Sequence, residues 1–366
     1  MELPILLFSI SLIFCCFFIT LLILNTISTR KLPLGPTGLP IIGSLLQLGS
    51  KPNHSLAKLA KIHSPLMTLK FHQILQKHDK TFSARTIPDA VSFQPNREAT
   101  LSWIPPENTW RKKRRICNMH MFDNQRLDLL QELRHQKAEQ LWLGLDATTL
   151  NLISNMIFSI DMVDPEFKKA HEFKELVWTI MEDAGVPNLS DYFPDLFIAG
   201  SDTSALTIEW AMAELLRKPE ELNKVRQEVI QQIGTESPVK ESDMDKLPYL
   251  QAVVKETMRL HPAAPLLLPH KAQHDVQVLG FTMPKDSQVL VNAWAIGRDP
   301  KTWERPLEFL PLRFMESSVD FLSLYRLVRA GEYLPDGMTP EKLDMEEQFG
   351  VTLRKAIPLV AIPSRE

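Results

Sequence analysis

The sequence has little cysteine and no excess of charge. Its three cysteines are Cys15, Cys16 and Cys117, too few for a disulfide framework and without the Cys-x-x-Cys spacing of a metal site. This usage fits a reducing, cytosol-facing compartment. The formal net charge over 366 residues is −3. Because a chain so close to neutral is not typical of nucleic-acid binding, we expect no nucleic acid as a partner.

Charge is missing altogether between Leu3 and Thr29, where most residues are Leu, Ile or Phe. A membrane span needs about 20 apolar residues, so residues 1–29 are predicted to form a transmembrane signal anchor. A cleavable signal peptide has a shorter apolar region and a small-residue cleavage site, and we find no such site here. Arg30 and Lys31 follow at once, which predicts that the downstream chain faces the cytosol.

The segment that follows, residues 30–50, is rich in proline and is not expected to form a helix or a strand. Pro33, Pro36 and Pro40 recur within residues 30–50, and because proline fixes φ and removes a donor this segment is predicted to be a stiff hinge. The remaining residues 51–366 are expected to form one domain, mainly α with a small β portion. Helices are expected at 55–63, from 110, at 173–184, 195–217, 219–233 and 250–260; strands are expected at 67–71, 276–282 and 288–292, the last two around a turn at 283–286; and 300–314 is expected to be irregular.

Glu256 and Arg259 are three residues apart, so on a helix they lie on one face and can pair. His261-Pro262 is expected to end that helix, because proline restricts the residue before it. A Glu-x-x-Arg spacing alone is more typical of a solvated pair. The apolar residues around this pair, between Leu250 and Leu260, nevertheless predict a helix with one buried side.

Residues 199–204, with the sequence Ala-Gly-Ser-Asp-Thr-Ser, permit two interpretations. Glycine followed by polar residues is unfavourable inside a helix, so the segment is either a break capped by Ser201 or Asp202, or a helix distorted where a ligand crosses it. In the second case the Thr203 hydroxyl is drawn away from its normal backbone pairing. Local sequence does not decide between them.

A basic cluster, Trp-Arg-Lys-Lys-Arg-Arg at 110–115, opens another predicted helix. Its composition favours a solvated cationic face. The alternative is functional: Trp110 and Arg114, four residues apart, would point the same way toward a bound anion.

Taken together, these segments resemble the cytochrome P-450 family of haem-thiolate monooxygenases. The resemblance rests on the anchor, the proline hinge, and four further motifs in the family's order, and the stretches 247–264 and 336–363 are similar to plant geraniol 8-hydroxylases. The motifs are Trp110-x-x-x-Arg114, Ala199-Gly200-x-Asp202-Thr203-Ser204, Glu256-x-x-Arg259 and Pro311-x-Arg313-Phe314.

The resemblance implies a role for each motif. It implies haem as cofactor, NADPH electrons delivered by a flavoprotein cytochrome P-450 reductase, a small apolar substrate, and a location in the endoplasmic reticulum membrane facing the cytosol. Trp110, Arg114 and, with a looser match, His270 would hold haem propionates; Asp202 and Thr203 would line the oxygen pocket and relay protons; and Glu256, Arg259 and Arg313 would form a structural triad.

The chain departs from the family at the iron ligand. The family holds iron with a cysteine thiolate in a loop that should follow Arg313-Phe314, yet there is no cysteine after Cys117, and we assign no metal ligand. For a family-like loop peptide, codons can be chosen that, when read one base later, encode residues 322–333 without a mismatch. We therefore hypothesise that this segment is the haem loop translated out of frame.

Other segments expected of the family are missing too, near residues 71–73, 142–145 and 193–195 and after Tyr333, so the fold is expected to be internally truncated. Two functions compete. The first is a monooxygenase hydroxylating a monoterpenoid alcohol such as geraniol. The second, favoured for the chain as written, is a non-catalytic, haem-free, membrane-anchored remnant. A membrane-tethered interaction protein is a third class, which nothing in the sequence supports.

Overall fold

A computed structural model describes residue 36 and residues 44–63, 78–87, 101–120, 122–134, 151, 194–234, 241–278, 280–315, 332–334, 338–350, 352–360 and 362–363. The predicted anchor, most of the hinge, the strand at 67–71 and the helix at 173–184 lie outside these residues. So does the segment between 316 and 331. Within the described ranges no helix is both long enough and apolar enough to cross a membrane.

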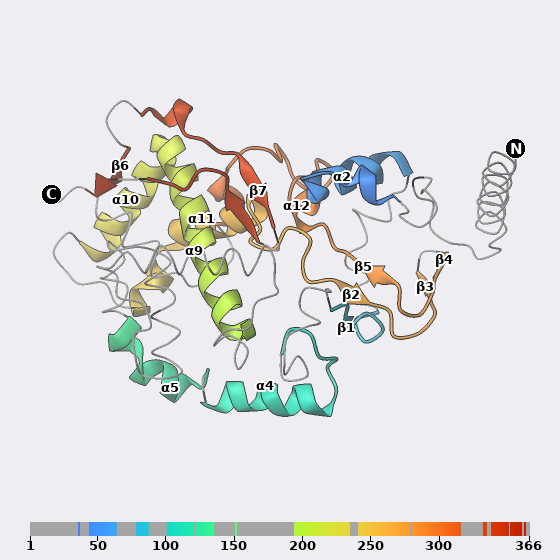
Figure 1. Cartoon of the computed structure of the whole chain (residues 1–366). Coiled ribbons are helices and arrows are strands. Elements are labelled where there is room, and N and C mark those ends of the chain that lie inside the picture. The colour runs from blue at the N-terminus through green and yellow to red at the C-terminus, as the bar shows by residue number, and fades with distance from the viewer. Residues whose placement is uncertain are drawn as a thin grey trace, which may run out of the picture.

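The described residues are mainly helical, with short strands (Figure 1). The helices are α2 (Pro52–His63), α4 (Asn108–His120), α5 (Asn124–Leu129), α9 (Pro194–Arg217), α10 (Pro219–Ile233), α11 (Pro248–Leu260) and α12 (Ala293–Ile296), with 3-10 turns η1 (Leu45–Gln47), η7 (Glu241–Lys246), η8 (Pro311–Phe314) and η9 (Pro340–Lys342). The strands are β1 (Ala84–Arg85), β2 (His270–Lys271), β3 (Val276–Val278), β4 (Phe281–Met283), β5 (Gln288–Val289), β6 (Glu332–Tyr333), β7 (Glu347–Phe349), β8 (Leu353–Lys355) and β9 (Ile362–Pro363).

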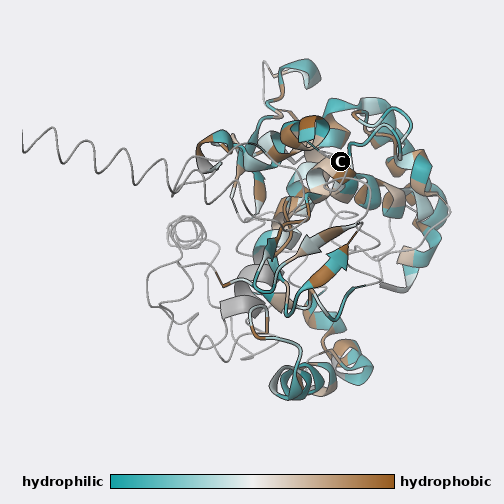
Figure 2. Cartoon of the chain, turned by 90° about the vertical axis from the view of Figure 1, so that its right-hand side faces the viewer, coloured by the Kyte–Doolittle hydropathy of each residue, from teal (hydrophilic) through white to brown (hydrophobic). Residues whose placement is uncertain are grey.

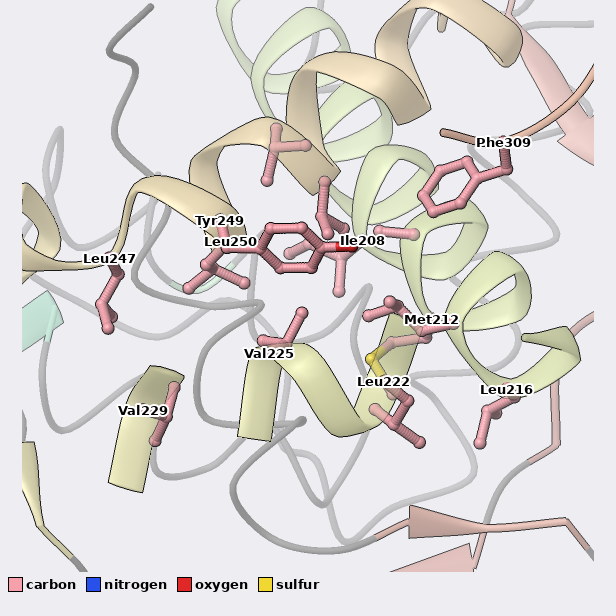
Figure 3. Close-up of a cluster of buried hydrophobic side chains, with 14 of the residues drawn as sticks. Ile208, Met212, Leu216, Leu222, Val225, Val229, Leu247, Tyr249, Leu250 and Phe309 are labelled. Atoms are coloured by element: carbon pink, nitrogen blue, oxygen red, sulfur yellow. The ribbon is translucent and has the colours of Figure 1, made fainter. Parts of the chain in front are cut away.

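The main hydrophobic core lies between α9, α10 and α11. Figure 3 shows side chains from all three helices converging around the ring of Tyr249, with Ile208 beside it and Val225 on α10 facing them. Phe309, from the irregular segment after α12, closes the same cluster and is fully buried. Burial of such a side chain is worth about 1.5–3 kcal/mol, so this three-helix cluster dominates the packing of the described residues.

The ends of α10 and α11 follow from sequence. Pro219 and Pro248 occupy first-turn positions, where the missing N–H is not needed. Gly234 caps α10, as predicted, and His261 caps α11. The N-terminus of α11 has a further partner, because Glu228 of α10 accepts the Tyr249 N–H at 2.7 Å and the Leu250 N–H at 3.0 Å. A carboxylate at a helix N-terminus also complements the helix dipole.

The ambiguous segment 199–204 lies inside α9, which runs without a break from Pro194 to Arg217. The interpretation as a capped break is therefore wrong. Within this helix Ser204 Oγ donates to the Gly200 carbonyl at 2.9 Å, and the Thr203 carbonyl accepts the hydroxyl of Thr207, one turn further on, at 2.7 Å. Such bonds to the preceding turn let hydroxyl residues remain in a helix and often bend it.

The small β portion is confirmed, with two corrections: the strand predicted at 288–292 ends at Val289, because Asn292 already caps α12, and one turn was not predicted. Residues 276–282 do not form one strand, because β3 and β4 make a hairpin that turns at Gly280, whose φ is +82°. Glycine reaches that conformation without steric cost. The strands β1, β2 and β5 form an antiparallel sheet, and a second apolar cluster packs on it: Phe82, Ala272, Val278 and Val289.

Two helices lie at the edge of the molecule. Figure 1 draws α4 and α5 along the lower edge, below α9, and Figure 2 shows α4 end-on with a largely hydrophilic surface. On the opposite side, α2 packs against α12. Asn292 joins these two helices, since its side chain caps α12 at the Ala295 N–H (2.9 Å) and donates to the Asn53 carbonyl (2.7 Å).

Candidate functional site

The side chain of Glu256 lies at the centre of a buried ion cluster at the end of α11. Its carboxylate accepts two bonds from Arg259, at 2.6 and 2.8 Å, and one from Arg313 Nε at 3.2 Å. It also accepts the Leu310 N–H at 2.7 Å. The exposed fractions of the Glu256 and Arg259 side chains are 0% and 2%. This carboxylate therefore joins α11 to η8, and the structure brings together the three residues of the predicted triad.

Arg259 also binds the backbone of the irregular segment that follows α12. Its guanidinium donates to the carbonyls of Gly297, Pro306 (2.7 Å) and Glu308 (2.9 Å), and it lies over the Trp303 ring at 5.3 Å. A side chain at position 297 would overlap the Arg259 carbonyl oxygen, so only glycine permits this close approach. The planar, multiply donating guanidinium is suited to holding several acceptors at once.

A second cluster lies on the β1–β2 pair, where His270 is buried opposite Arg85. His270 Nδ1 lies 2.7 Å from the Phe82 carbonyl, and Nε2 lies 2.7 Å from Arg85 Nη1. Arg85 Nη1 also lies 2.5 Å from Nδ1; since the Phe82 carbonyl needs a donor at Nδ1, a neutral ring offers its acceptor lone pair to the guanidinium at Nε2. Burial lowers the pKa of His270, and the charge of Arg85 lowers it further. The cation at this position is consequently Arg85.

Sequence reasoning missed Arg85. Its only local signal is a charged residue beside Ala84 in a short β-prone stretch, and its importance follows from the cross-strand pairing with His270. Because both ring nitrogens of His270 already have partners, a guanidinium is the better-placed donor to an anion here.

Asp202 and Thr203 lie on consecutive positions of α9 and are both half-buried. The Thr203 carbonyl accepts the Thr207 hydroxyl, so this turn of the helix is tied by side-chain bonds. These are the two residues for which the family resemblance predicts proton relay.

Trp110 and Arg114 lie on α4, as predicted. The Trp110 Nε1–H donates to the Leu101 carbonyl at 3.0 Å, and Arg114 is exposed. In Figure 1, α4 lies along the lower edge, away from the strand pair that carries His270. The structure thus groups the predicted residues as the triad on α11 and η8, the pair on α9, the pair on α4, and His270 with Arg85.

A family model for cytochrome P450 matches residues 33–198 and 187–335. The chain belongs to the cytochrome P450 family. It is 37% identical to geraniol 8-hydroxylase of Catharanthus roseus over 465 aligned positions, covering 92% of this chain and 94% of that protein. It is 35% identical to geraniol 8-hydroxylase of Swertia mussotii over 463 positions, covering 91% and 94%. Within the cytochrome P450 family it is therefore of the geraniol 8-hydroxylase-like type.

Solved structures agree on the fold. A zebra fish cytochrome P450 with progesterone matches with a TM-score of 0.70 at 21% identity, covering 86% of this chain and 99% of that chain. A second zebra fish structure, with abiraterone, matches with a TM-score of 0.71 at 22% identity, covering 87% and 100%. The described helices and small sheets thus have the cytochrome P450 fold.

The family uses haem, with NADPH electrons delivered by a reductase, and in cytochromes P450 a cysteine thiolate holds the iron. Cys117, the last cysteine in the sequence, is on α4, whereas the family's ligand would follow Phe314. Among the described residues no group of His, Cys, Asp and Glu side chains is arranged to hold a metal ion. The residues present therefore do not fit thiolate-ligated haem, and no reaction step through it follows from this chain.

Proposed function

We propose that the chain comes from a monooxygenase that hydroxylates a small apolar substrate, such as a monoterpenoid alcohol, and that the polypeptide as written is a haem-free, non-catalytic form of it. The substrate class rests on the identity to two geraniol 8-hydroxylases over most of their length. The loss of activity rests on one observation, the absence of any cysteine after Cys117, because the thiolate is required for O–O cleavage.

Internal truncation is part of the same proposal. The alignment with the Catharanthus roseus relative runs over 465 positions, although this chain has 366 residues. Positions of the relative therefore lack a counterpart here. The family match is also divided in two, and its parts meet at residues 187–198, around the short join predicted at 193–195. Lost core elements leave apolar faces without partners, which favours aggregation.

The described side chains support the assignment of roles on the retained scaffold. The Glu256, Arg259 and Arg313 side chains would brace the proximal side of the fold through the contacts given above. Asp202 and Thr203 would hold and pass protons from α9. Arg85, assisted by His270, would offer a cation to a propionate-like anion.

The decisive experiment is a carbon-monoxide difference spectrum of the reduced full chain, expressed with haem supply. Geraniol 8-hydroxylase of Catharanthus roseus, expressed in the same way, is the positive control. We expect a thiolate-type band from the control and none from this chain, because no thiolate is available. Far-UV circular dichroism reports whether the chain is folded. A thiolate-type band from this chain would refute the haem-free assignment.

The missing loop has a test of its own. If residues 322–333 are the haem loop read out of frame, the transcript across residues 319–338 carries the family-like codons in a shifted frame. Sequencing that transcript is expected to show them. A spliced, in-frame message without this nucleotide pattern would refute the frame-shift hypothesis. The cysteine loop would then have been replaced in the gene itself.

Location is proposed from the sequence of residues 1–29. We place the chain in the endoplasmic reticulum membrane, with residues 51–366 on the cytosolic side, where the reductase of the family would act. Membranes washed with alkaline carbonate are expected to retain the full chain and to release a variant that lacks residues 3–29. Release of the full chain by the same wash would contradict the anchor.

A further inference from the structure

A second buried ionic cluster, separate from the Glu256 triad, surrounds His261 at the C-terminal end of α11. His261 Nε2 lies 2.9 Å from a carboxylate oxygen of Glu214 on α9, and Nδ1 lies 3.3 Å from a carboxylate oxygen of Glu347 on β7. The exposed fractions of the His261 and Glu214 side chains are 7% and 2%. A single imidazole therefore bridges two carboxylates from distant parts of the sequence.

The ring is also held in orientation. His261 stacks on Trp210 of α9 with ring centroids 3.9 Å apart and an interplanar angle of 1°. Trp210 in turn donates to the Leu353 carbonyl of β8 at 3.0 Å, and Lys355 Nζ lies 5.0 Å from its ring. Because Trp210 is fully buried, this stack leaves the imidazole little freedom to turn away from the carboxylates.

Glu347 has partners from three further parts of the chain. It accepts Trp294 Nε1–H at 2.9 Å and Arg298 Nη2–H at 3.0 Å, and His54 of α2 lies 3.4 Å away. Burial lowers the pKa of Arg298 to about 10, which leaves it charged at neutral pH. The contacts of Glu347 on β7 thus reach α2, α12, the segment after α12 and the end of α11.

The two carboxylates are ionised at neutral pH. Burial alone would raise the pKa of Glu214, but hydrogen bonding and the charges of His261 and Arg217 hold it below the ordinary value. Burial likewise acts to raise the pKa of Glu347, and His261, Arg298 and His54 lower it overall. An ionised carboxylate only accepts hydrogen bonds, while a neutral imidazole donates from one nitrogen and accepts at the other.

We propose that His261 is a proton-operated clasp that holds α9 against β7. In its doubly protonated form the ring donates to Glu214 and Glu347 at once; after it loses one proton, one carboxylate faces a lone pair and that contact opens. The other charged groups around the clasp are Arg217 behind Glu214, Arg298 and His54 behind Glu347, and Lys355 across Trp210.

The proposal predicts that the fold loosens as pH rises, because deprotonation removes one of the two bonds. The test is urea unfolding of the full chain in detergent at about pH 6 and about pH 9, a range that spans histidine titration, followed by circular dichroism. We expect the urea midpoint of the wild-type chain to be lower at the higher pH. In His261→Gln, whose amide has no proton to lose in this range, the fall is expected to vanish.

Two variants keep the test decisive if His261→Gln fails to fold. In a His54→Gln background, which removes the contribution of the His54–Glu347 contact, Glu347→Gln retains the shape of the cluster and removes one of the charges that hold the proton, so it is expected to reduce the fall in the midpoint. Its neighbour Glu346 is 71% exposed and pairs with Lys51 at 2.8 Å, so Glu346→Gln in the same background serves as the matched control and should keep the full fall. A wild-type midpoint that does not change with pH, or an equal fall in Glu347→Gln and Glu346→Gln, overturns the clasp.

Discussion

Replacing Glu256 by Gln tests how much the described fold depends on one carboxylate. The substitution keeps the size of the side chain but removes the negative charge that faces Arg259 at 2.6 Å and Arg313 at 3.2 Å. Arg259 is 2% exposed, so water cannot replace the lost charge. Breaking a buried pair by removing one partner costs about 3–5 kcal/mol.

The assay is urea unfolding of the full chain in detergent, followed by far-UV circular dichroism. With an m value of about 2 kcal/mol per molar urea, the expected loss lowers the midpoint by roughly 2 M. Glu346→Gln removes an exposed carboxylate that pairs with Lys51 at 2.8 Å and is expected to change stability by less than about 1 kcal/mol. A Glu256→Gln midpoint as high as that of Glu346→Gln would show that the triad does not hold this fold together.

Three further outcomes follow from described contacts. Gly297→Ala places a Cβ against the Arg259 carbonyl and is expected to cost about 1–3 kcal/mol, again measured as the urea midpoint; an unchanged midpoint would mean that the close approach relaxes freely. Asn292→Ala removes the cap of α12 and the bond to the Asn53 carbonyl and is expected to cost at least about 1 kcal/mol; Asn292→Asp, which can still cap but cannot donate to Asn53, separates the two contributions. Glu214 and Glu347 have lowered pKa values in the fold, so the stability they supply is complete above the ordinary glutamate pKa and is lost as pH falls through the lowered values; an acid titration followed by circular dichroism is expected to show less of this loss in Glu214→Gln than in the wild-type chain.

Local patterns were sufficient for the helices of the core. Pro219 and Gly234 mark the two ends of α10, and Pro248 and His261 mark those of α11, because proline and glycine act on the backbone at their own positions. The turn predicted at 283–286 is present, with the Ser287 N–H donating to the Pro284 carbonyl, but the second turn, at Gly280, was missed. Short strands give weak periodic signals, and their pairing decides where they end.

The partners of the site residues could not be read in this way. Glu228 caps a helix that begins twenty residues later, and Arg85 meets His270 across a sheet. The contact between Glu214 and Glu347 through His261 joins three distant segments. The spacing of residues within a segment does not predict these long-range contacts, because they form only when helices and strands from different parts of the chain pack together. The family resemblance supplied the triad, but not these additional partners.

The binding of Arg259 to the backbone of residues 297–308 determines which substitutions this segment can accept. Its guanidinium binds the backbone carbonyls of residues 297, 306 and 308, and every amino acid carries that same acceptor. Side chains at 306 and 308 can therefore be exchanged without weakening the attachment, whereas position 297 is confined to glycine. In a gene copy that is no longer under selection for catalysis, the amino acids of this segment could therefore change, apart from Gly297, while its backbone keeps its position against α11.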